Sequence, residues 1–195
     1  MPRRSSSYAL AALVVVAALA LGGCGDSHTK VSTGTYAGES GASAPYLDVG
    51  PLVYEVQLSR ELNPFSPADA PYLQGLTPAQ RKLETGQEWF GVFVQVYNNS
   101  SIPHLAASSI TISDTQSNFY EPVVPEASNQ FAYRGGVVAG KGVLPAPGTI
   151  AAAGSTQGAL LLYKIHVVSL DNRPLEVKIV DPLDPAITAN AELDV

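Results

Sequence analysis

Apolar and polar residues alternate along several short segments of this chain, the pattern of β-strands with one buried face. In the first such segment, the residues expected to face the core are Leu52, Tyr54, Val56 and Leu58. In the segment Trp89–Tyr97, one face holds Phe90, Val92, Val94 and Val96, and the other holds Trp89, Phe93 and Tyr97. A strand that is apolar on both faces is typical of the middle of a sheet. This segment is therefore predicted to lie centrally.

Shorter strands are predicted at Ser109–Ser113, Phe119–Glu121, Val137–Val143, Ala159–Val168 and Leu175–Val180. The residues Asp114–Asn118 have the composition of a hairpin turn. One short helix is predicted after Thr77, because its hydroxyl can cap the helix, Pro78 suits the first helical position and Gln80 completes a capping box. Gly86 is expected to end this helix.

These elements predict an all-β fold, an immunoglobulin-like antiparallel β-sandwich of about seven strands with one short helix. The sandwich is expected to span residues 47–183, and residues 184–195 are expected to form a polar C-terminal tail. The chain contains a single cysteine, so Trp89 must pack without the disulfide of antibody domains.

The N-terminal residues predict a lipoprotein signal peptide over residues 1–23. Two basic residues, Arg3 and Arg4, precede an uncharged apolar run from Tyr8 to Leu21. This run is shorter than the roughly twenty residues that a membrane-spanning helix needs. Cleavage is therefore expected.

The residues Leu21, Gly22, Gly23 and Cys24 resemble a bacterial lipobox, in which the cysteine thiol receives a diacylglyceryl group that carries fatty acids such as palmitate. A lipid also explains why one cysteine stands alone in an oxidising compartment, where a free thiol is a liability. We expect the chain to be lipid-anchored at Cys24 on the extracytoplasmic face of a bacterial membrane.

The composition of the chain predicts a flexible tether and argues against nucleic-acid binding. Residues 24–46 are rich in Gly, Ser, Thr and Ala and are expected to form a disordered linker. Without Arg3 and Arg4, nine basic residues remain against 17 acidic ones, a net charge of −8. Such a surface repels phosphate backbones and anionic lipids, so the membrane is expected to be a partner through the lipid alone.

The succession of segments resembles the telokin-like, immunoglobulin-fold domains of bacterial secreted lipoproteins, a family of unknown function related in fold to a mycobacterial immunoprotective extracellular antigen. The matching features are Trp89–Ser100, Ile110 with Ile112, Asp114 with Tyr120, the turn Pro147-Gly148, Leu160–His166 and Leu175–Asp181. The resemblance covers about half of the chain and implies a sandwich at the cell surface. Because the family has no agreed role, it implies no mechanism.

Catalytic chemistry is not indicated. The sequence has no Gly-x-Ser-x-Gly elbow, no His-Glu-x-x-His motif and no phosphate-binding glycine loop. Its histidines, His28, His104 and His166, are far apart, and His104 is expected in a turn. The acidic residues Asp181, Asp184, Glu192 and Asp194 do not have the spacing of a calcium loop. We therefore predict no enzyme, no cofactor and no metal site.

The loop Glu61–Gly75 is the strongest candidate for partner binding, because prolines stiffen it and it contains Phe65 and Tyr72. Aromatic side chains on stiff surface loops lose little entropy on binding. Alternatively, both rings fold back and plug one end of the sandwich. The sequence favours a non-enzymatic domain that binds an envelope protein or polymer, and leaves a surface carrier or sensor of a small ligand or metal as the alternative.

Overall fold

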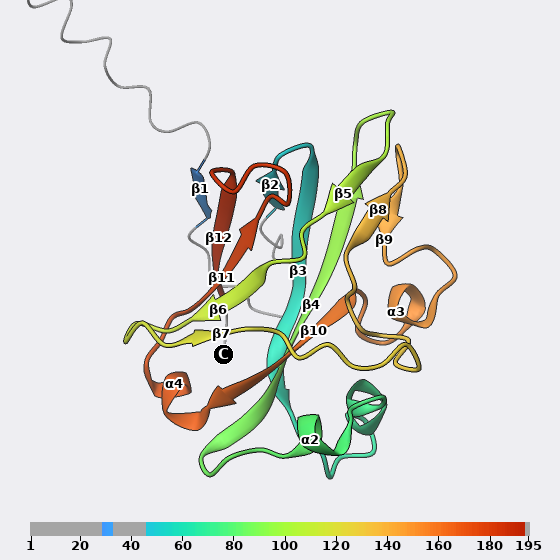
Figure 1. The fold of residues 1–195 in the computed structure, drawn as a ribbon. Coiled ribbons are helices and arrows are strands. Elements are labelled where there is room, and N and C mark those ends of the chain that lie inside the picture. Colours follow the sequence, from blue (N-terminus) through green and yellow to red (C-terminus); the bar gives the residue numbers. More distant parts are fainter. Residues whose placement is uncertain (1–28, 33–45, 194–195) are drawn as a thin grey trace, which may run out of the picture.

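Two β-sheets pack face to face around the residues that the alternation predicted to be buried (Figure 1). The computed structural model describes residues 29–32 and 46–193. One sheet has the strand order β10-β4-β3-β2, with β9 paired to part of β4. Its strands are β2 (Tyr46–Val49), β3 (Leu52–Leu62), β4 (Gln87–Asn98), β9 (Val143–Leu144) and β10 (Ala159–His166).

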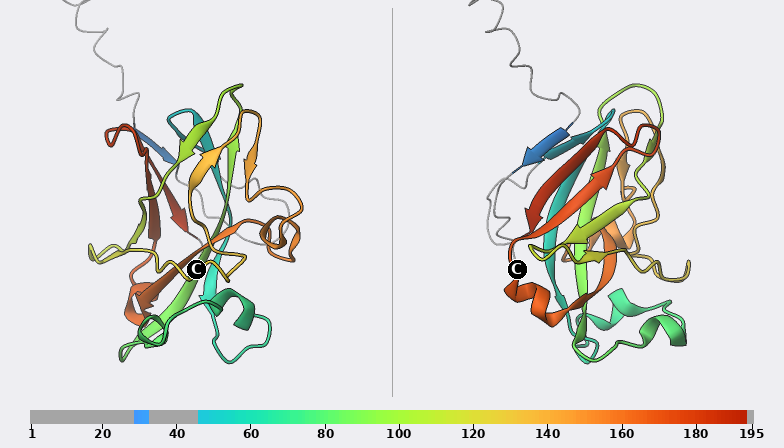
Figure 2. Two further views of the ribbon diagram at one scale, coloured as in Figure 1. Left: turned by 45° about the vertical axis from the view of Figure 1, so that its right-hand side comes forward. Right: turned by 60° about the vertical axis from the view of Figure 1, so that its left-hand side comes forward.

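The other sheet has the order β1-β12-β11-β6-β7, and Figure 2 shows it lying across the first. Its strands are β1 (Thr29–Ser32), β6 (Ile110–Ser113), β7 (Phe119–Tyr120), β11 (Leu175–Val180) and β12 (Thr188–Leu193). Neighbouring strands are antiparallel except for β1 and β12, which are parallel. A separate two-stranded ribbon consists of β5 (His104–Ala106) and β8 (Gly136–Val138).

The all-β class is confirmed, and the predicted short helix is present as α2 (Pro78–Arg81). Thr77 and Gln80 form the capping box, with the Gln80 amide 3.2 Å from the Thr77 hydroxyl. The helix ends after one turn, before Gly86, because Lys82 is already extended. Three other single-turn segments are the 3₁₀ helix η1 (Ala70–Leu73), α3 (Ile150–Ala153) and α4 (Val167–Asp171).

The strand β4 lies between β3 and β10, as its two apolar faces predicted. Its inner face, with Phe90, belongs to the main core between the sheets. Its outer face belongs to a second group, here called the outer cluster, which covers the far side of the sheet. The outer cluster consists of Leu62, Tyr72, Leu73, Leu76, Trp89, Phe93, Leu160 and Leu162.

The prediction that Leu58 shares a face with Val56 is wrong. The pairing of β3 with β4 shifts between Val56 and Leu58, so Gln57 is an extra residue in β3. A β-bulge of this kind reverses the alternation of the side chains that follow it. Leu58 consequently lies opposite Phe93 and packs against the outer cluster.

Both predicted ends of the domain are also wrong. Residues 188–193 are not a polar tail but the strand β12, which pairs with β11 and buries Ala189 and Ala191. Within the predicted linker, the structure describes Thr29–Ser32, and these residues pair with β12 as strand β1. In β12, backbone hydrogen bonding to the edge of β11 offsets the low strand propensity of its alanine and asparagine residues.

Candidate functional site

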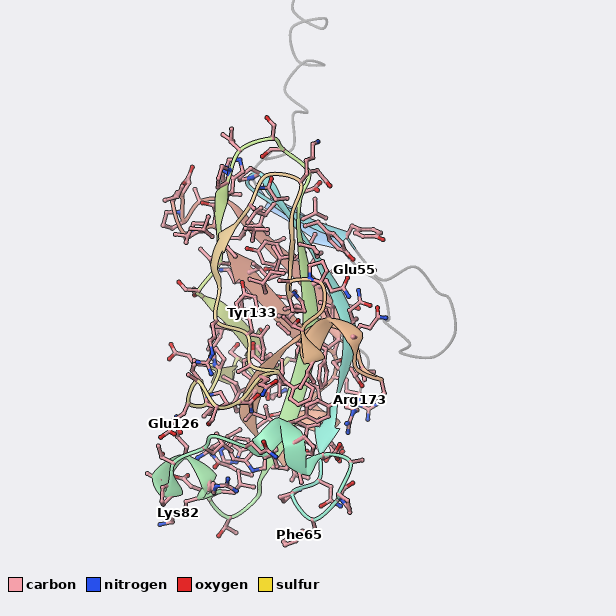
Figure 3. The ribbon with its side chains drawn as sticks, turned by 90° about the vertical axis from the view of Figure 1, so that its right-hand side faces the viewer. Glu55, Phe65, Lys82, Glu126, Tyr133 and Arg173 are labelled. Carbon is pink, nitrogen blue, oxygen red and sulfur yellow. The ribbon has the colours of Figure 1, made fainter. Side chains whose placement is uncertain are left out.

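The segment of residues 63–76, here called the 63–76 loop, covers the outer face of the β10-β4-β3 sheet at one end of the sandwich (Figure 1). Tyr72 lies in the interior, 6% exposed, with its ring edge-on to Phe93 and Phe131 at centroid distances of 5.1 and 4.8 Å. Of the two candidate rings, Tyr72 thus folds back onto the sheet. Phe65 is 92% exposed and projects from the lower end of the molecule (Figure 3).

Asp69 holds the tip of this loop in place. Its carboxylate accepts hydrogen bonds from the Asn63 amide, at 2.9 Å, and from the Arg60 guanidinium, at 2.5 Å. The side chain of Asn63 in turn accepts from the Phe65 amide at 2.9 Å. The bond from Arg60 lowers the pKa of Asp69 against the opposing effect of burial. The backbone at Phe65 is therefore connected to Arg60 of β3 through the side chains of Asn63 and Asp69.

A second attachment lies at the other end of the loop, where Asn129 reaches it from residues 123–133. The Asn129 side-chain amide donates to the carbonyls of Tyr72 and Gln74 at 2.8 and 2.9 Å. Its oxygen accepts from the amides of Phe131 and Ala132 at 2.9 and 3.0 Å. Because every polar group of this buried side chain is used, the loop is held in one position.

A groove of about 450 Å³ opens beside Phe65, between the loop and the start of β4. This groove, here called the tip groove, is lined by Glu61, Asn63, Phe65, Leu83, Glu88 and Trp89, among other residues. It combines an exposed ring, a buried indole and three carboxylates, those of Glu61, Asp69 and Glu88. Its volume lies in the range of small-ligand and side-chain pockets.

The carboxylate of Glu88 is the least satisfied acidic group of the described residues. Its Oε1 atom is buried without a hydrogen-bond partner. Burial, and after it the charge of Glu61, raises the pKa of Glu88. Sequence reasoning missed Glu88 and treated Glu61 only as a loop boundary. The available signal was the position of Glu88, an acidic residue directly before the uncharged, largely apolar run Trp89–Val94.

A smaller, apolar pocket of about 290 Å³ lies beside β10 and is lined by Val123, Tyr133 and Arg134, among other residues. The Arg134 guanidinium already donates to the carbonyls of Pro125 and Glu126, at 3.0 and 2.5 Å. The Tyr133 hydroxyl donates to the Ala107 carbonyl at 2.7 Å. The polar groups around this pocket therefore serve the fold.

A hydrogen-bonded series joins Tyr120, Ser169 and Asp114, with distances of 2.7 Å between successive side-chain oxygens. This is a combination of groups also found in catalytic sites. However, Ser169 is fully buried in α4, so a substrate cannot reach its hydroxyl. The series connects α4 to the β6–β7 hairpin and is structural.

The other predicted positions are separate from the tip groove. His104 lies on β5 rather than in a turn, and His166 ends β10. Asp181 accepts hydrogen bonds from the amides of Leu183 and Asp184 at 2.8 and 2.9 Å, so it stabilises a turn. Among residues 29–32 and 46–193, no group of three or more His, Cys, Asp or Glu side chains could hold a metal ion.

The signal peptide, Leu21–Gly23 of the lipobox, Cys24, His28 and Asp194 lie outside the described residues. In the part of the chain that the structure describes, no helix is long and apolar enough to cross a membrane.

Comparison with known proteins gives the fold. No protein-family model matches the sequence, and no curated protein matches it. The yjhA protein of Bacillus subtilis is 11% identical, with a TM-score of 0.50 over 78% of this chain and 98% of that chain. An uncharacterised β-sandwich protein from Clostridium difficile 630 is 8% identical, with a TM-score of 0.42 over 84% of this chain and 95% of that chain.

The candidate lipoprotein ycdA of Bacillus subtilis is 8% identical, with a TM-score of 0.46 over 79% of this chain. The chain spans 39% of the length of ycdA. At these identities the similarity extends to the β-sandwich architecture and no further.

Proposed function

We propose that this protein is a non-enzymatic interaction domain, lipid-anchored at Cys24 on the outer face of a bacterial membrane, which binds an envelope protein or polymer through the tip of the 63–76 loop. Membership of the telokin-like group of secreted lipoproteins is part of this proposal. The observation that supports it is the exposure of Phe65, 92%, on a loop whose backbone is tied down by Asp69 and Asn129. A ring held in this way loses little entropy when a partner covers it.

The position of β1 supports the same proposal. Thr29 follows Cys24 by only five residues, and β1 lies at the end of the sandwich opposite to α2 and Phe65 (Figures 1 and 3). A lipid at Cys24 would therefore hold the β1 end next to the bilayer. The Phe65 tip would then be directed away from the membrane, where a partner can reach it.

Site-specific crosslinking in intact cells tests this proposal. We expect Phe65→p-benzoylphenylalanine to form one dominant photo-crosslinked product. The matched control is the same substitution at Phe119, a ring that is 73% exposed on β7. Phe65→Ala is expected to abolish capture of that product in pull-downs and leave the thermal unfolding temperature unchanged, because a ring that is 92% exposed contributes little packing.

Equal crosslinking at positions 65 and 119, or none at either, would overturn the loop assignment. The same sample tests the anchor, because the N-terminal peptide of the mature protein should have the mass of a diacylated Cys24. An unmodified Cys24 would overturn the membrane part of the proposal.

A further inference from the structure

The tip groove has an unbalanced negative charge. Glu61 and Glu88 both line it, and within the described ranges neither forms an ion pair. Asp69, which also lines the groove, is neutralised by Arg60 at 2.5 Å. The chain thus supplies a cation to one of the three carboxylates and leaves the other two unpaired, close enough for the charge of Glu61 to act on Glu88.

Glu88 also lacks a hydrogen bond that its burial demands. A buried carboxylate oxygen without a donor is costly, and native proteins keep such groups rarely. Although Oε1 itself is buried, Glu88 lines the tip groove, so a bound group can approach the rest of its side chain. A positive charge bound beside Glu61 and Glu88 would offset the repulsion between them and the cost of burying the Glu88 carboxylate.

The aromatic residues of the groove favour an organic cation over a metal ion. Lys164 already places its Nζ atom 5.3 Å from the centre of the Trp89 ring, and that ammonium donates to the Lys82 carbonyl at 2.7 Å. Phe65, by contrast, offers an unoccupied ring at the groove entrance. Such a ring attracts ammonium and guanidinium groups and covers the methylene chain that bears them.

We infer that the tip groove binds a lysine or arginine side chain of a basic partner segment, with Phe65 against its methylene chain and Glu61 and Glu88 around its charge. This inference rests on the proposed interaction function and names the chemistry of the partner. An acidic or neutral segment would leave both carboxylates unpaired, so the partner is basic where it meets the groove.

The test measures the affinity of two labelled peptides for the full-length protein by fluorescence anisotropy. The ionic strength is about physiological, so that long-range electrostatic attraction is screened. One peptide alternates lysine with glycine, and the other is the same peptide with every lysine acetylated, which removes the charge and keeps the length. We expect the lysine peptide to bind at least about tenfold more tightly, since each buried charge-assisted contact contributes at least that factor.

The double substitution Glu61→Gln with Glu88→Gln should weaken binding of the lysine peptide by about tenfold or more. The matched control is Glu121→Gln with Glu126→Gln, which removes the same charge from two exposed positions and should change binding by less than about twofold. Both double variants are expected to fold, because glutamine keeps the shape of glutamate and removes repulsion in the groove.

Equal weakening by the two double variants would mean attraction to the overall negative charge and would overturn the inference. Absence of any preference for the lysine peptide would overturn it as well. If the Phe65 crosslink in cells persists unchanged in the Glu61→Gln, Glu88→Gln protein, the cation inference fails and the proposed function stands. If the peptide result is as expected but no crosslink forms at position 65, the groove binds cations and the proposed partner interaction fails.

Discussion

Replacing Phe93 with alanine is expected to lower the free energy of unfolding by about 3–5 kcal/mol, the usual cost of deleting a fully buried aromatic ring. Phe93 is 0% exposed and lies in the outer cluster, edge-on to Tyr72. Its removal would leave a cavity between β4 and the 63–76 loop. Urea unfolding followed by fluorescence of the single tryptophan, Trp89, measures the change.

The matched control is Phe119→Ala, which deletes the same ring from an exposed position on β7 and should change the free energy by less than about 0.5 kcal/mol. The effect of Phe93→Ala should also be local. Amide hydrogen exchange is expected to accelerate in residues 63–76 more than in β11, because the outer cluster lies on the opposite face of the sheet from the main core. A loss below about 1 kcal/mol would mean that the loop does not depend on this packing.

The second large effect is expected at Asp114, whose carboxylate accepts four hydrogen bonds in the β6–β7 hairpin. The donors are the Gln116 and Asn118 amides, the Asn118 side chain and the Ser169 hydroxyl, at 2.7–3.0 Å. Burial raises the pKa of Asp114, but the hydrogen bonds outweigh it and lower the pKa from 3.8 to about 2. Asp114→Asn should cost about 2–3 kcal/mol near neutral pH, because the new amide cannot accept from all of these donors.

The pH dependence follows from the lowered pKa. Since the folded protein holds the proton more weakly than the unfolded chain, the contribution of Asp114 is complete above about pH 4 and is lost as the pH falls toward 2. The shift corresponds to about 2 kcal/mol. Urea unfolding at about pH 5 and pH 2 measures the free energy of unfolding of the wild type and of Asp114→Asn. The difference between the two proteins at each pH cancels the titration of other carboxylates such as Asp69. A difference that stays constant across this range would contradict the assignment.

The order and type of the central elements were predictable from local patterns. The two apolar faces of Trp89–Tyr97 predicted a central strand because β4 has neighbours on both edges and apolar side chains packed against both faces. The Thr77-Pro78-Ala79-Gln80 signature predicted α2 because a capping box involves atoms only three residues apart. Asp114 was placed in a turn for the same local reason.

Features that depend on contacts between distant residues were not predictable. The bulge at Gln57 reversed the face of Leu58, and nothing in the alternation before it indicates an unpaired residue. The alternation in residues 188–193 involves small residues such as Ala189 and Ala191, whose strand propensity is weak. These residues form β12 because β11 offers a sheet edge.

The candidate site divides in the same way. The sequence by itself determined that the Glu61–Gly75 loop is stiff, bears two rings and belongs to a β-sandwich, because proline geometry and period-two alternation are local properties. Only the tertiary structure decided that Tyr72 is buried against Phe93 and Phe131 while Phe65 is exposed. It also decided that Glu61 and Glu88, 27 positions apart, line one groove. The exposure of Phe65 and the proximity of Glu61 to Glu88 both depend on the packing of β3 beside β4. This packing is a property of the folded chain as a whole.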